Sequence, residues 1–484
     1  MKKGFSPIRG ADGRKIYEIP EKHREMEKQL AENKMGVMPV GKLLMNMAGP
    51  MIVSMLVQAL YNVVDSMFVA RVNEDALAAL SLAFPMQNLM IAVATGLGVG
   101  INAMISRSLG EKRRDWANRY AMQGILLEGI GYLVFLCIGL FAARPFIALQ
   151  AGDMERIAEY GTVYLMICCT CSFGLFLQIT LERILQSTGR TMLTMITQSV
   201  GAVVNIILDP ILIFGLFGAP QLGVAGAAIA TIFGQCIASG LALFFNLTRN
   251  HDVQLQWRLL RPHREGLLQI LAIGVPSVLM VSIGSIMTFC VNKILIVFSS
   301  TAVAVFGVYF KLQSFVFMPV FGLNNGLVPI VSYNYGARKR ERMNRAIRLA
   351  FITAVCIMLV GFAIFQLMPD QLLLLFGASE DMLGIGVPAL RIISISFLVA
   401  GICVVSGSIC QALSKGLYSL LISFGRQIVV LVPAAFILSR FGVLNLVWLA
   451  WPIAEVASII LSLFFVRRTI RNLDWTCADE KETT

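Results

Sequence analysis

Two stretches of this chain match one another without a gap: FPMQNLMIAVATGLGVGINAMISRSLGEKRRDWANR at residues 84–119 and FKLQSFVFMPVFGLNNGLVPIVSYNYGARKRERMNR at residues 310–345. The matched positions lie 226 residues apart (310 − 84), and Pro50 falls on Pro276 at the same spacing. The identical pairs within the two stretches include Phe84/Phe310, Gln87/Gln313, Gly96/Gly322, Gly100/Gly326, Ser106/Ser332, Gly110/Gly336, Arg114/Arg340, Asn118/Asn344 and Arg119/Arg345. We therefore expect two copies of one structural unit.

Both copies have the composition of a membrane protein. Of the 484 residues, 57% are apolar and only 14% are charged, whereas soluble domains carry about 25% charged residues. Apolar runs long enough to cross a hydrocarbon core of about 30 Å recur along the chain. They lie at about 43–70, 76–106, 117–142, 157–180, 191–217, 222–248, 266–298, 301–333, 345–367, 383–413, 416–438 and 442–466. We expect an all-α integral membrane protein with twelve transmembrane helices, since a membrane β-barrel would show alternating segments of about 10 residues.

The positive charge is distributed unevenly. The formal net charge of +12 would suggest a nucleic-acid partner in a soluble protein. Here the Lys and Arg residues gather in residues 1–42, in the connections that follow the even-numbered spans and in the C-terminal tail; the other connections hold only Arg71, Arg144, Arg156 and Arg440. Cytoplasmic loops of membrane proteins carry such an excess. The pattern predicts that both termini are cytoplasmic and that the basic surface faces anionic lipid, not nucleic acid.

Six spans precede the polar connection Asn250–Glu265, and six follow it. An even number of spans per copy gives the two copies the same orientation in the membrane, so the repeat is parallel. We expect a cytoplasmic N-terminal tail (1–41), an N-lobe (42–248), a cytoplasmic connection (249–265), a C-lobe (266–466) and a cytoplasmic C-terminal tail (467–484). Two such lobes can rock about a shared central cleft, which indicates a transporter.

Residues 1–40 are polar and lack the short apolar core of a secretory signal. Nine of the ten cysteines fall inside the predicted spans. We expect these cysteines to be small apolar fillers and not disulfides or metal ligands.

The first copy carries acidic residues inside its spans, where a charge costs roughly 2.5–3.5 kcal/mol on insertion scales. At about 1.5 Å per residue, Asp65 and Asp209 should both lie in the outer half of the membrane. Tyr61 and Asn205 each precede one of these residues by a helical turn on the same face, and Thr231 should reach a similar depth. These five residues form a candidate ion site.

The chemistry of this site has alternatives. A carboxylate held away from water exchanges a proton near neutral pH. Two carboxylates with amide and hydroxyl oxygens also suit a hard cation such as Na⁺, for which Asp65, Asn205, Asp209 and Thr231 would be the ligands. A structural interpretation is also open, in which Asp65 is interfacial and Asp209 merely precedes the helix-breaking Pro210.

The second copy lacks this cluster, because Val291 occupies the position that matches Asp65. Its spans hold Lys311, Arg391, Arg426 and Glu455, and we expect Arg426 and Glu455 to neutralise one another. Ion coupling is therefore expected in the N-lobe.

The cleft between the lobes should be lined by polar amides that would be costly against lipid, and by an apolar stripe. These candidate cavity residues are Gln87, Asn88, Gln313, Phe306, Phe310 and Met318. The glycines and prolines inside spans favour close helix packing, and Pro50 and Pro276 also suit a hinge.

Four segments resemble the multidrug and toxic compound extrusion (MATE) family, in order along the chain. They are Pro50 with YNVVDSMFV at 61–69, ISRSLG at 105–110, NIILDP at 205–210 and GVAGAAIAT at 223–231. The likeness covers about residues 40–470 and is closest to the DinF-like branch of bacterial multidrug pumps. It implies a V-shaped pair of six-helix lobes with a central cavity. It also implies an N-lobe cation site at Tyr61, Asp65, Asn205, Asp209 and Thr231, and a bend of the first helix at Pro50.

The resemblance implies a secondary active antiporter that exports amphipathic, cationic xenobiotics in exchange for H⁺ or Na⁺. It places the protein in a bacterial cytoplasmic membrane as a multi-pass monomer, with small-molecule drugs or organic cations as partners. The alternative function is a flippase for lipid-linked saccharides, which predicts a cationic cavity at Lys293, Lys311 or Arg391. An intramembrane enzyme is disfavoured because the spans hold no His/Asp metal motif and no Ser/His pair. No GxxxxGK[ST] motif is present, so direct driving by ATP is disfavoured. We also expect no cofactor and no ATPase subunit.

Overall fold

The computed structural model describes residues 33–473 except 71, 73, 152 and 153, together with two short strands before them. The strands are β1 (Pro7–Arg9) and β2 (Lys15–Tyr17), which pair antiparallel. The α-helices are α2 (Lys34–Val37), α3 (Val40–Ala70), α4 (Glu74–Gly110), α5 (Arg114–Cys137), α6 (Ala143–Ala151), α7 (Glu155–Thr170), α8 (Phe173–Ser187), α9 (Thr191–Phe214), α10 (Val224–Thr248), α11 (Arg264–Leu295), α12 (Ser300–Gly336), α13 (Arg340–Leu367), α14 (Pro369–Leu374), α15 (Glu380–Ser394), α16 (Phe397–Ala412), α17 (Gly416–Phe424), α18 (Val432–Ser439), α19 (Leu444–Val447) and α20 (Ala450–Arg471). Two π-helical segments, η1 (Ile138–Ala142) and η4 (Gly425–Leu431), and two 3₁₀ turns, η2 (Leu216–Gly218) and η3 (Trp257–Leu260), complete the helices.

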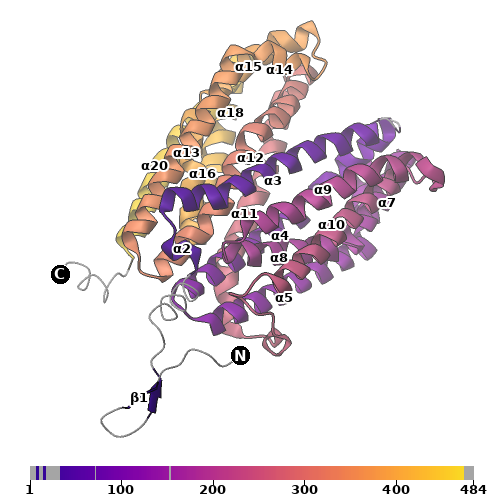
Figure 1. The fold of residues 1–484 in the computed structure, drawn as a ribbon. Coiled ribbons are helices and arrows are strands. Elements are labelled where there is room, and N and C mark those ends of the chain that lie inside the picture. The colour runs from indigo at the N-terminus through magenta and orange to yellow at the C-terminus, as the bar shows by residue number, and fades with distance from the viewer. Residues whose placement is uncertain are drawn as a thin grey trace.

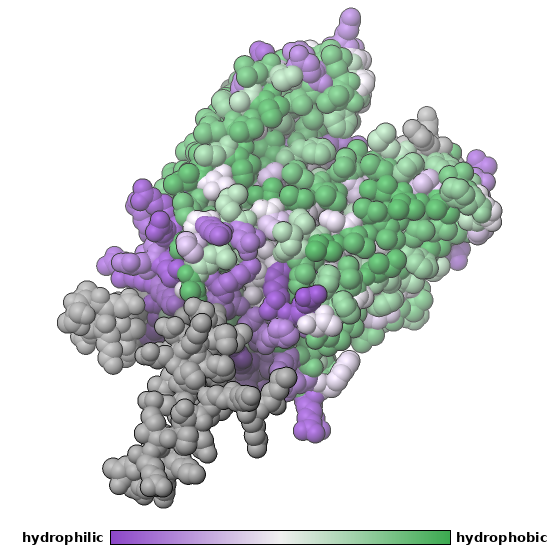
Figure 2. Space-filling view, in the orientation of Figure 1, coloured by the Kyte–Doolittle hydropathy of each residue, from purple (hydrophilic) through white to green (hydrophobic). Residues whose placement is uncertain are grey.

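The prediction of a helical bundle with twelve spans is confirmed. Ten of the described helical segments are long and apolar enough to cross a membrane, and two further spans are bent pairs of helices. One pair is α7 and α8, bent by 45°, and the other is α15 and α16, bent by 53°. Figure 1 shows two bundles that diverge from one end. Their outer surfaces in Figure 2 are mostly apolar, and polar residues gather at the end where the bundles meet.

The repeat extends to details of the backbone. Lys112 (φ 59°) and Arg338 (φ 57°) both have left-handed backbone conformations, and they lie 226 residues apart (338 − 112). Each follows a long helix that ends in the same way, with the N–H of the next residue donating to the carbonyl five residues before it, Arg113 to Ser108 and Lys339 to Asn334, both at 2.9 Å. This is the hydrogen-bond pattern of a Schellman motif. The two copies therefore share one local geometry.

The repeated glycines lie where the lobes touch. Gly96 and Gly100 of α4 face α11, where an added Cβ would meet Val278 and the carbonyl of Ile270. Gly322 and Gly326 of α12 face α3 in the same way, against Ile52 and Ala48. Small residues at a spacing of four let helix backbones approach closely in membranes. The packing interpretation of these glycines is thus confirmed.

The lobes come closest at one end, which we call the closed end. There α4 and α12 cross, and an added Cβ on Gly110 would collide with the carbonyl of Tyr333, while one on Gly336 would collide with the carbonyl of Arg107. Helices α3 and α11 link the lobes further, because α3 packs on both α9 and α12, and α11 packs on both α17 and α4. Both helices run unbroken through Pro50 and Pro276, and the hinge at Pro50 stays a prediction.

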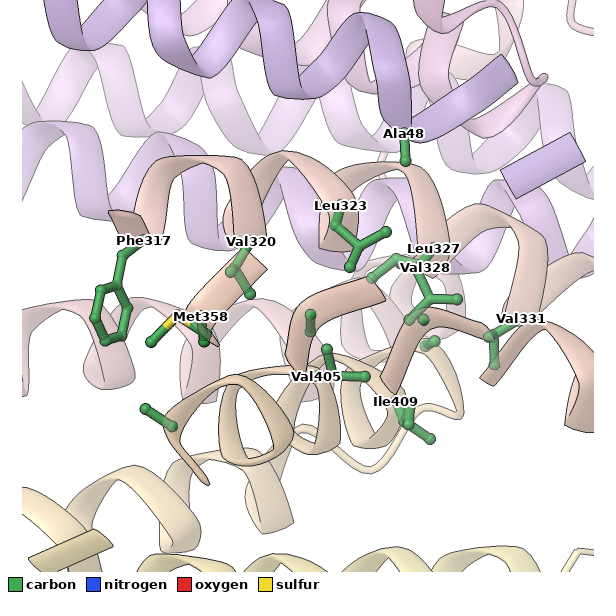
Figure 3. Close-up of a cluster of buried hydrophobic side chains, with 14 of the residues drawn as sticks. Ala48, Phe317, Val320, Leu323, Leu327, Val328, Val331, Met358, Val405 and Ile409 are labelled. Atoms are coloured by element: carbon green, nitrogen blue, oxygen red, sulfur yellow. The ribbon is translucent and has the colours of Figure 1, made fainter. Parts of the chain in front are cut away.

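The C-lobe core surrounds α12. Figure 3 shows Ala48 of α3 on one side of this helix and Val405 and Ile409 of α16 on the other. Further along α12, Phe306 packs edge-to-face on Trp451 with ring centroids 5.4 Å apart. Since lipid tails are as apolar as these side chains, close packing stabilises the contact more than the hydrophobic effect does.

The segment Asn33–Met38, which includes α2, bridges the lobes at the closed end. The Asn33 amide donates to the Thr188 carbonyl of the N-lobe at 2.9 Å. From the C-lobe, the Arg342 guanidinium donates to the carbonyls of Met35 at 3.2 Å and Met38 at 2.6 Å. Burial and the nearby charge of Arg190 lower the pKa of Lys34. The predicted tails, 1–41 and 467–484, otherwise lie largely outside the described residues.

One predicted boundary was wrong. The fourth predicted span ends at about residue 180, which leaves Arg183 in the cytoplasmic connection after it, but α8 continues to Ser187 and carries Arg183 inside the bundle. The apolar run ends at residue 180 because the last helical turns of α8 face the lobe interior with polar side chains. Hydropathy alone therefore ended this span too early.

Candidate functional site

Three helices of the N-lobe bring the predicted ion-site residues together. Tyr61 and Asp65 lie four residues apart on α3, Asn205 and Asp209 lie four apart on α9, and Thr231 lies on α10. Residues four apart share one face of a helix. Because α9 packs against both α3 and α10, these faces converge.

An amide and a hydroxyl link the cluster. The Asn205 amide lies 3.4 Å from the Asp209 carboxylate and 3.2 Å from the Thr231 hydroxyl. In the orientation that satisfies both neighbours, its nitrogen donates to Asp209 and its oxygen accepts from Thr231. Asn205 is therefore positioned by two partners on two helices.

The two carboxyl groups face one another. Asp209 is fully buried, and the carboxyl groups of Asp65 and Asp209 are within hydrogen-bonding reach of each other. The Asp65 Oδ1 atom is buried and has no hydrogen-bond donor among the described residues. Tyr61 lies close enough to interact electrostatically with both. Like charges at this separation repel, so a proton or a cation between them would stabilise the pair.

Gln87 lies behind this cluster. Its amide donates to the Tyr164 hydroxyl at 3.1 Å, and Tyr164 is within electrostatic range of Asp65. The sequence suggested Gln87 for the wall of the cleft; its amide instead bonds inside the N-lobe. Asn88, one residue on, donates to the Ser285 hydroxyl of α11 at 2.8 Å, which is a contact between lobes.

The other predicted cavity residues lie on α12. Phe306 is buried in the aromatic core of the C-lobe. Phe310 packs edge-on against it, with ring centroids 4.8 Å apart. Gln313 and Met318 are half-buried. A role of these residues in substrate contact stays a prediction.

A cavity of about 160 Å³ lies inside the N-lobe. It is lined mainly by polar side chains from α3, α4, α8, α9 and α10, with Asn325 contributed by α12. These polar lining residues include Ser54, Gln58, Tyr61, Thr95, Gln178, Glu182, Arg183, Gln186, Gln198, Asn205, Thr231, Gln235 and Asn325. The cavity thus reaches from the ion-site cluster to the α12 helix of the other lobe.

The sequence did not indicate Glu182, which lies at this cavity on α8. Its carboxylate accepts hydrogen bonds from Gln178 at 3.0 Å, Thr197 at 2.9 Å and Gln198 at 2.6 Å. Gln198 in turn accepts a hydrogen bond from Ser54 of α3. Three donors satisfy most of the lone pairs of a carboxylate. The charged pair Glu182-Arg183 was hidden because it follows the apolar run directly.

Arg183 connects the two lobes. Its guanidinium donates to Gln186 and to Asn325 of α12, both at 2.9 Å. Its side chain packs on Gly98 of α4, where an added Cβ would meet the Arg183 Cγ at 3.0 Å. The glycine therefore makes room for this arginine.

The charged residues of the C-lobe are arranged differently. Arg426 pairs with Glu455 at 2.6 Å, as expected. Lys293 lies over the Phe289 ring at 5.7 Å, and Lys311 and Arg391 are exposed. None of these three cations lines the cavity described above.

Known proteins agree with this architecture. The MatE family model matches residues 50–211 and 273–437, one segment in each lobe. The chain therefore belongs to the MatE family of membrane transporters and is not an enzyme. Multidrug export protein MepA of Staphylococcus saprophyticus is 27% identical over 88% of this chain and 93% of its own length.

Two further relatives show the range of the family. A protein of Shewanella oneidensis named FAD transporter is 25% identical over 91% of this chain and 97% of its own length. The solved structure of an outward-facing multidrug resistance MATE family transporter is 26% identical, covers 92% of this chain and 98% of that one, and superposes with a TM-score of 0.84.

Proposed function

We propose that this protein is a secondary active efflux antiporter that exports amphipathic, cationic compounds in exchange for H⁺ or Na⁺. The observation that carries the proposal is the convergence of Asp65 and Asp209 beside Asn205 and Thr231 inside one lobe. Relatives named multidrug export protein support the class of cargo.

The cluster suits either coupling ion. A proton shared between Asp65 and Asp209 would relieve the repulsion of two close carboxylates. For Na⁺, the carboxylate oxygens, the Asn205 amide oxygen and the Thr231 hydroxyl are hard oxygen ligands. The buried Asp65 Oδ1 that lacks a donor is an acceptor available to either ion.

Antiport follows when the two ligands stabilise opposite states. Binding of the ion from outside favours release of the cargo from the N-lobe cavity, and binding of the cargo from inside favours release of the ion. The contacts at Gly110 and Gly336 close one end. Hydrophilic residues gather at this end in Figure 2, and the connections rich in Lys and Arg, 107–119 and 338–348, follow the helices that meet there. By the positive-inside rule that end is cytoplasmic, so the conformation described here is outward-facing, with both termini in the cytoplasm of a bacterium.

The test is efflux of ethidium from loaded proteoliposomes under an imposed proton or Na⁺ gradient. Asp65→Asn and Asp209→Asn should each abolish gradient-driven efflux, because an amide neither exchanges a proton nor carries the charge that attracts a cation. Asp381→Asn is the matched control, because Asp381 is exposed at the start of α15. If both site variants pump at the wild-type rate under either gradient, the proposal is wrong.

The cargo is tested in the same vesicles. Loading them with FAD instead of ethidium compares an anion with a cation, since one relative is named FAD transporter. We expect gradient-driven loss of ethidium and retention of FAD. Preferential loss of FAD would keep the antiporter and replace the cationic cargo with an anionic one.

A further inference from the structure

A second carboxylate lies deeper in the N-lobe and takes no part in the cluster described above. Glu128 is on α5 and is 2% exposed. Both of its carboxyl oxygens are buried and have no hydrogen-bond partner among the described residues. An ionised carboxylate is strongly destabilised in such a place unless a donor or a positive charge pairs with it.

One positive charge reaches Glu128. Arg183 of α8 is within electrostatic range of it, and α8 packs against α5. Arg183, however, makes its hydrogen bonds elsewhere, to Gln186 and to Asn325 of the other lobe. The natural partner of Glu128 is thus held away from it by a contact between lobes.

The other helices around α5 bring no competing charge to Glu128. The groups that act electrostatically on Tyr120, two helical turns before Glu128, are Glu265, Arg107, Glu111 and Arg113. The start of α11 and the η3 turn, which also pack on α5, add Arg264 and Arg258. Of all the described charged groups, Arg183 is the one that acts on Glu128. Glu182, the neighbour of Arg183, is occupied by Gln178, Thr197 and Gln198. The charged residues of α7, which are Glu155, Arg156 and Glu159, belong to its first two turns.

We propose that Glu128 is a second proton-binding residue, which controls opening of the closed end by competing with Asn325 for Arg183. In the conformation seen here Glu128 carries a proton, and Arg183 bonds Asn325 across the lobes. When Glu128 releases this proton to the water of the cavity that Arg183 lines, its carboxylate attracts the guanidinium. Arg183 then leaves Asn325, and the closed end loses a contact between lobes.

The proposed competition explains two features of the N-lobe that the ion-site cluster does not explain. The two carboxyl oxygens of Glu128 have no hydrogen-bond partner among the described residues, and Arg183 is a donor that lies nearby. Gly98, on the α4 face that Arg183 crosses, leaves room for the arginine side chain, because a Cβ at this position would lie only 3.0 Å from the Arg183 Cγ and 3.2 Å from its Nε. The inference rests on the proposed function, because it assigns a step of the same transport cycle, but it concerns a residue outside that cation site.

The experiment measures the closed end directly. Nitroxide labels are attached to cysteines at Arg114 (start of α5) and Asn344 (first turns of α13), which are exposed and lie on different lobes, in a chain whose native cysteines are replaced. Double electron–electron resonance then gives the distribution of distances between the two labels, in liposomes, in acidic and in alkaline buffer. In the otherwise unchanged protein we expect a short distance in acid and a longer population in alkali.

Glu128→Gln, which mimics the protonated acid, should keep the short distance in both buffers, and Glu159→Gln, an exposed control on α7, should behave as the unchanged protein. Asn325→Ala should show the longer population even in acid. The inference is overturned if Glu128→Gln retains the full response to pH, or if Asn325→Ala leaves the acid distribution unchanged; the second result stands even if Glu128→Gln does not fold. Neither result depends on whether Asp65→Asn or Asp209→Asn abolishes efflux, so the two proposals fail separately.

Discussion

At the scale of single residues, the N-lobe holds its polar groups in two sets. One set surrounds Asp65 and Asp209, and the other surrounds Glu182 and Arg183. Both sets line or adjoin one cavity. In the proposed antiport, an ion is exchanged for a larger cargo, and the two sets would give each ligand its own groups within one lobe.

Asn205 is the residue of the first set that allows the sharpest test. Its amide bonds Asp209 and Thr231 at once, and hydrogen bonds to charged groups contribute about 1.5–3 kcal/mol. We expect Asn205→Ala to change the affinity for the coupling ion by about 10- to 100-fold, since about 1.4 kcal/mol is a tenfold change. Proton binding should become tighter, because an ionised carboxylate that loses a donated hydrogen bond holds a proton more strongly, whereas Na⁺ binding should become weaker, because an oxygen ligand is lost. The measurement is the ion concentration that gives half-maximal ethidium efflux.

Val203→Ala is the control for this variant, because Val203 lies on the exposed face of the same helix. The two changes remove side chains two residues apart, one inside the lobe and one outside. Equal ion dependence for the two variants would contradict the role given to the amide.

At the scale of elements, the repeated glycines determine how the lobes meet. Gly96 and Gly100 pack α4 on α11, and Gly322 and Gly326 pack α12 on α3. The same pattern on both sides makes the interface symmetric.

Gly110, at the closed end, is the repeated glycine where an added side chain would make the closest contact. An added Cβ there would collide with the carbonyl of Tyr333, which belongs to backbone and not to a flexible side chain. Overpacking costs about 1–3 kcal/mol, so we expect Gly110→Ala to lower the midpoint of thermal unfolding in detergent.

Gly240→Ala provides the matched comparison, because Gly240 lies within α10 and has nothing within 4 Å of the added Cβ. This change should leave the midpoint unchanged or raise it, since alanine favours a helix over glycine by about 1 kcal/mol. A midpoint for Gly110→Ala at or above that of Gly240→Ala would show that the closed end tolerates a wider spacing.

At the scale of the whole molecule, the direction of transport depends on which end faces the cytoplasm. The closed end carries the connection at residues 249–265, and the opposite end carries the turn before α15. We expect an impermeant maleimide to label Asp381→Cys on intact cells and His251→Cys only after the cells are permeabilised. Both residues are exposed, and the parent chain gives the background from native cysteines. The reverse pattern would invert the proposed orientation and, with it, the direction of export.

The sequence alone predicts the repeat, the twelve spans and the residues of the ion-site cluster. They depend on local properties: an apolar run long enough to span lipid is a helix wherever it occurs, and residues four apart share a face of that helix. The depth of Asp65 and Asp209 in the membrane, obtained by counting residues along their spans, stays a prediction. That the five residues meet is geometry the structure shows, while their role in coupling remains a proposal.

Other features depended on contacts between distant segments. Arg183 and Glu182 were missed because a hydropathy window ends at the first charged pair, although the helix continues. Gln87 was expected at the cleft because a polar amide is costly against lipid. The cleft and the interior of a lobe both keep an amide away from lipid, so this argument could not distinguish them. Its partner, Tyr164, lies 77 residues away in the chain.

The duplicated sequence, its apolar runs and its glycine spacing are sufficient to specify two similar helical bundles that pack closely. Which polar side chains share a cavity, which remain unpaired and which reach across to the other bundle depend on how the helices rotate about their axes. Those rotations result from packing summed over both lobes, and no single segment of the chain contains that information.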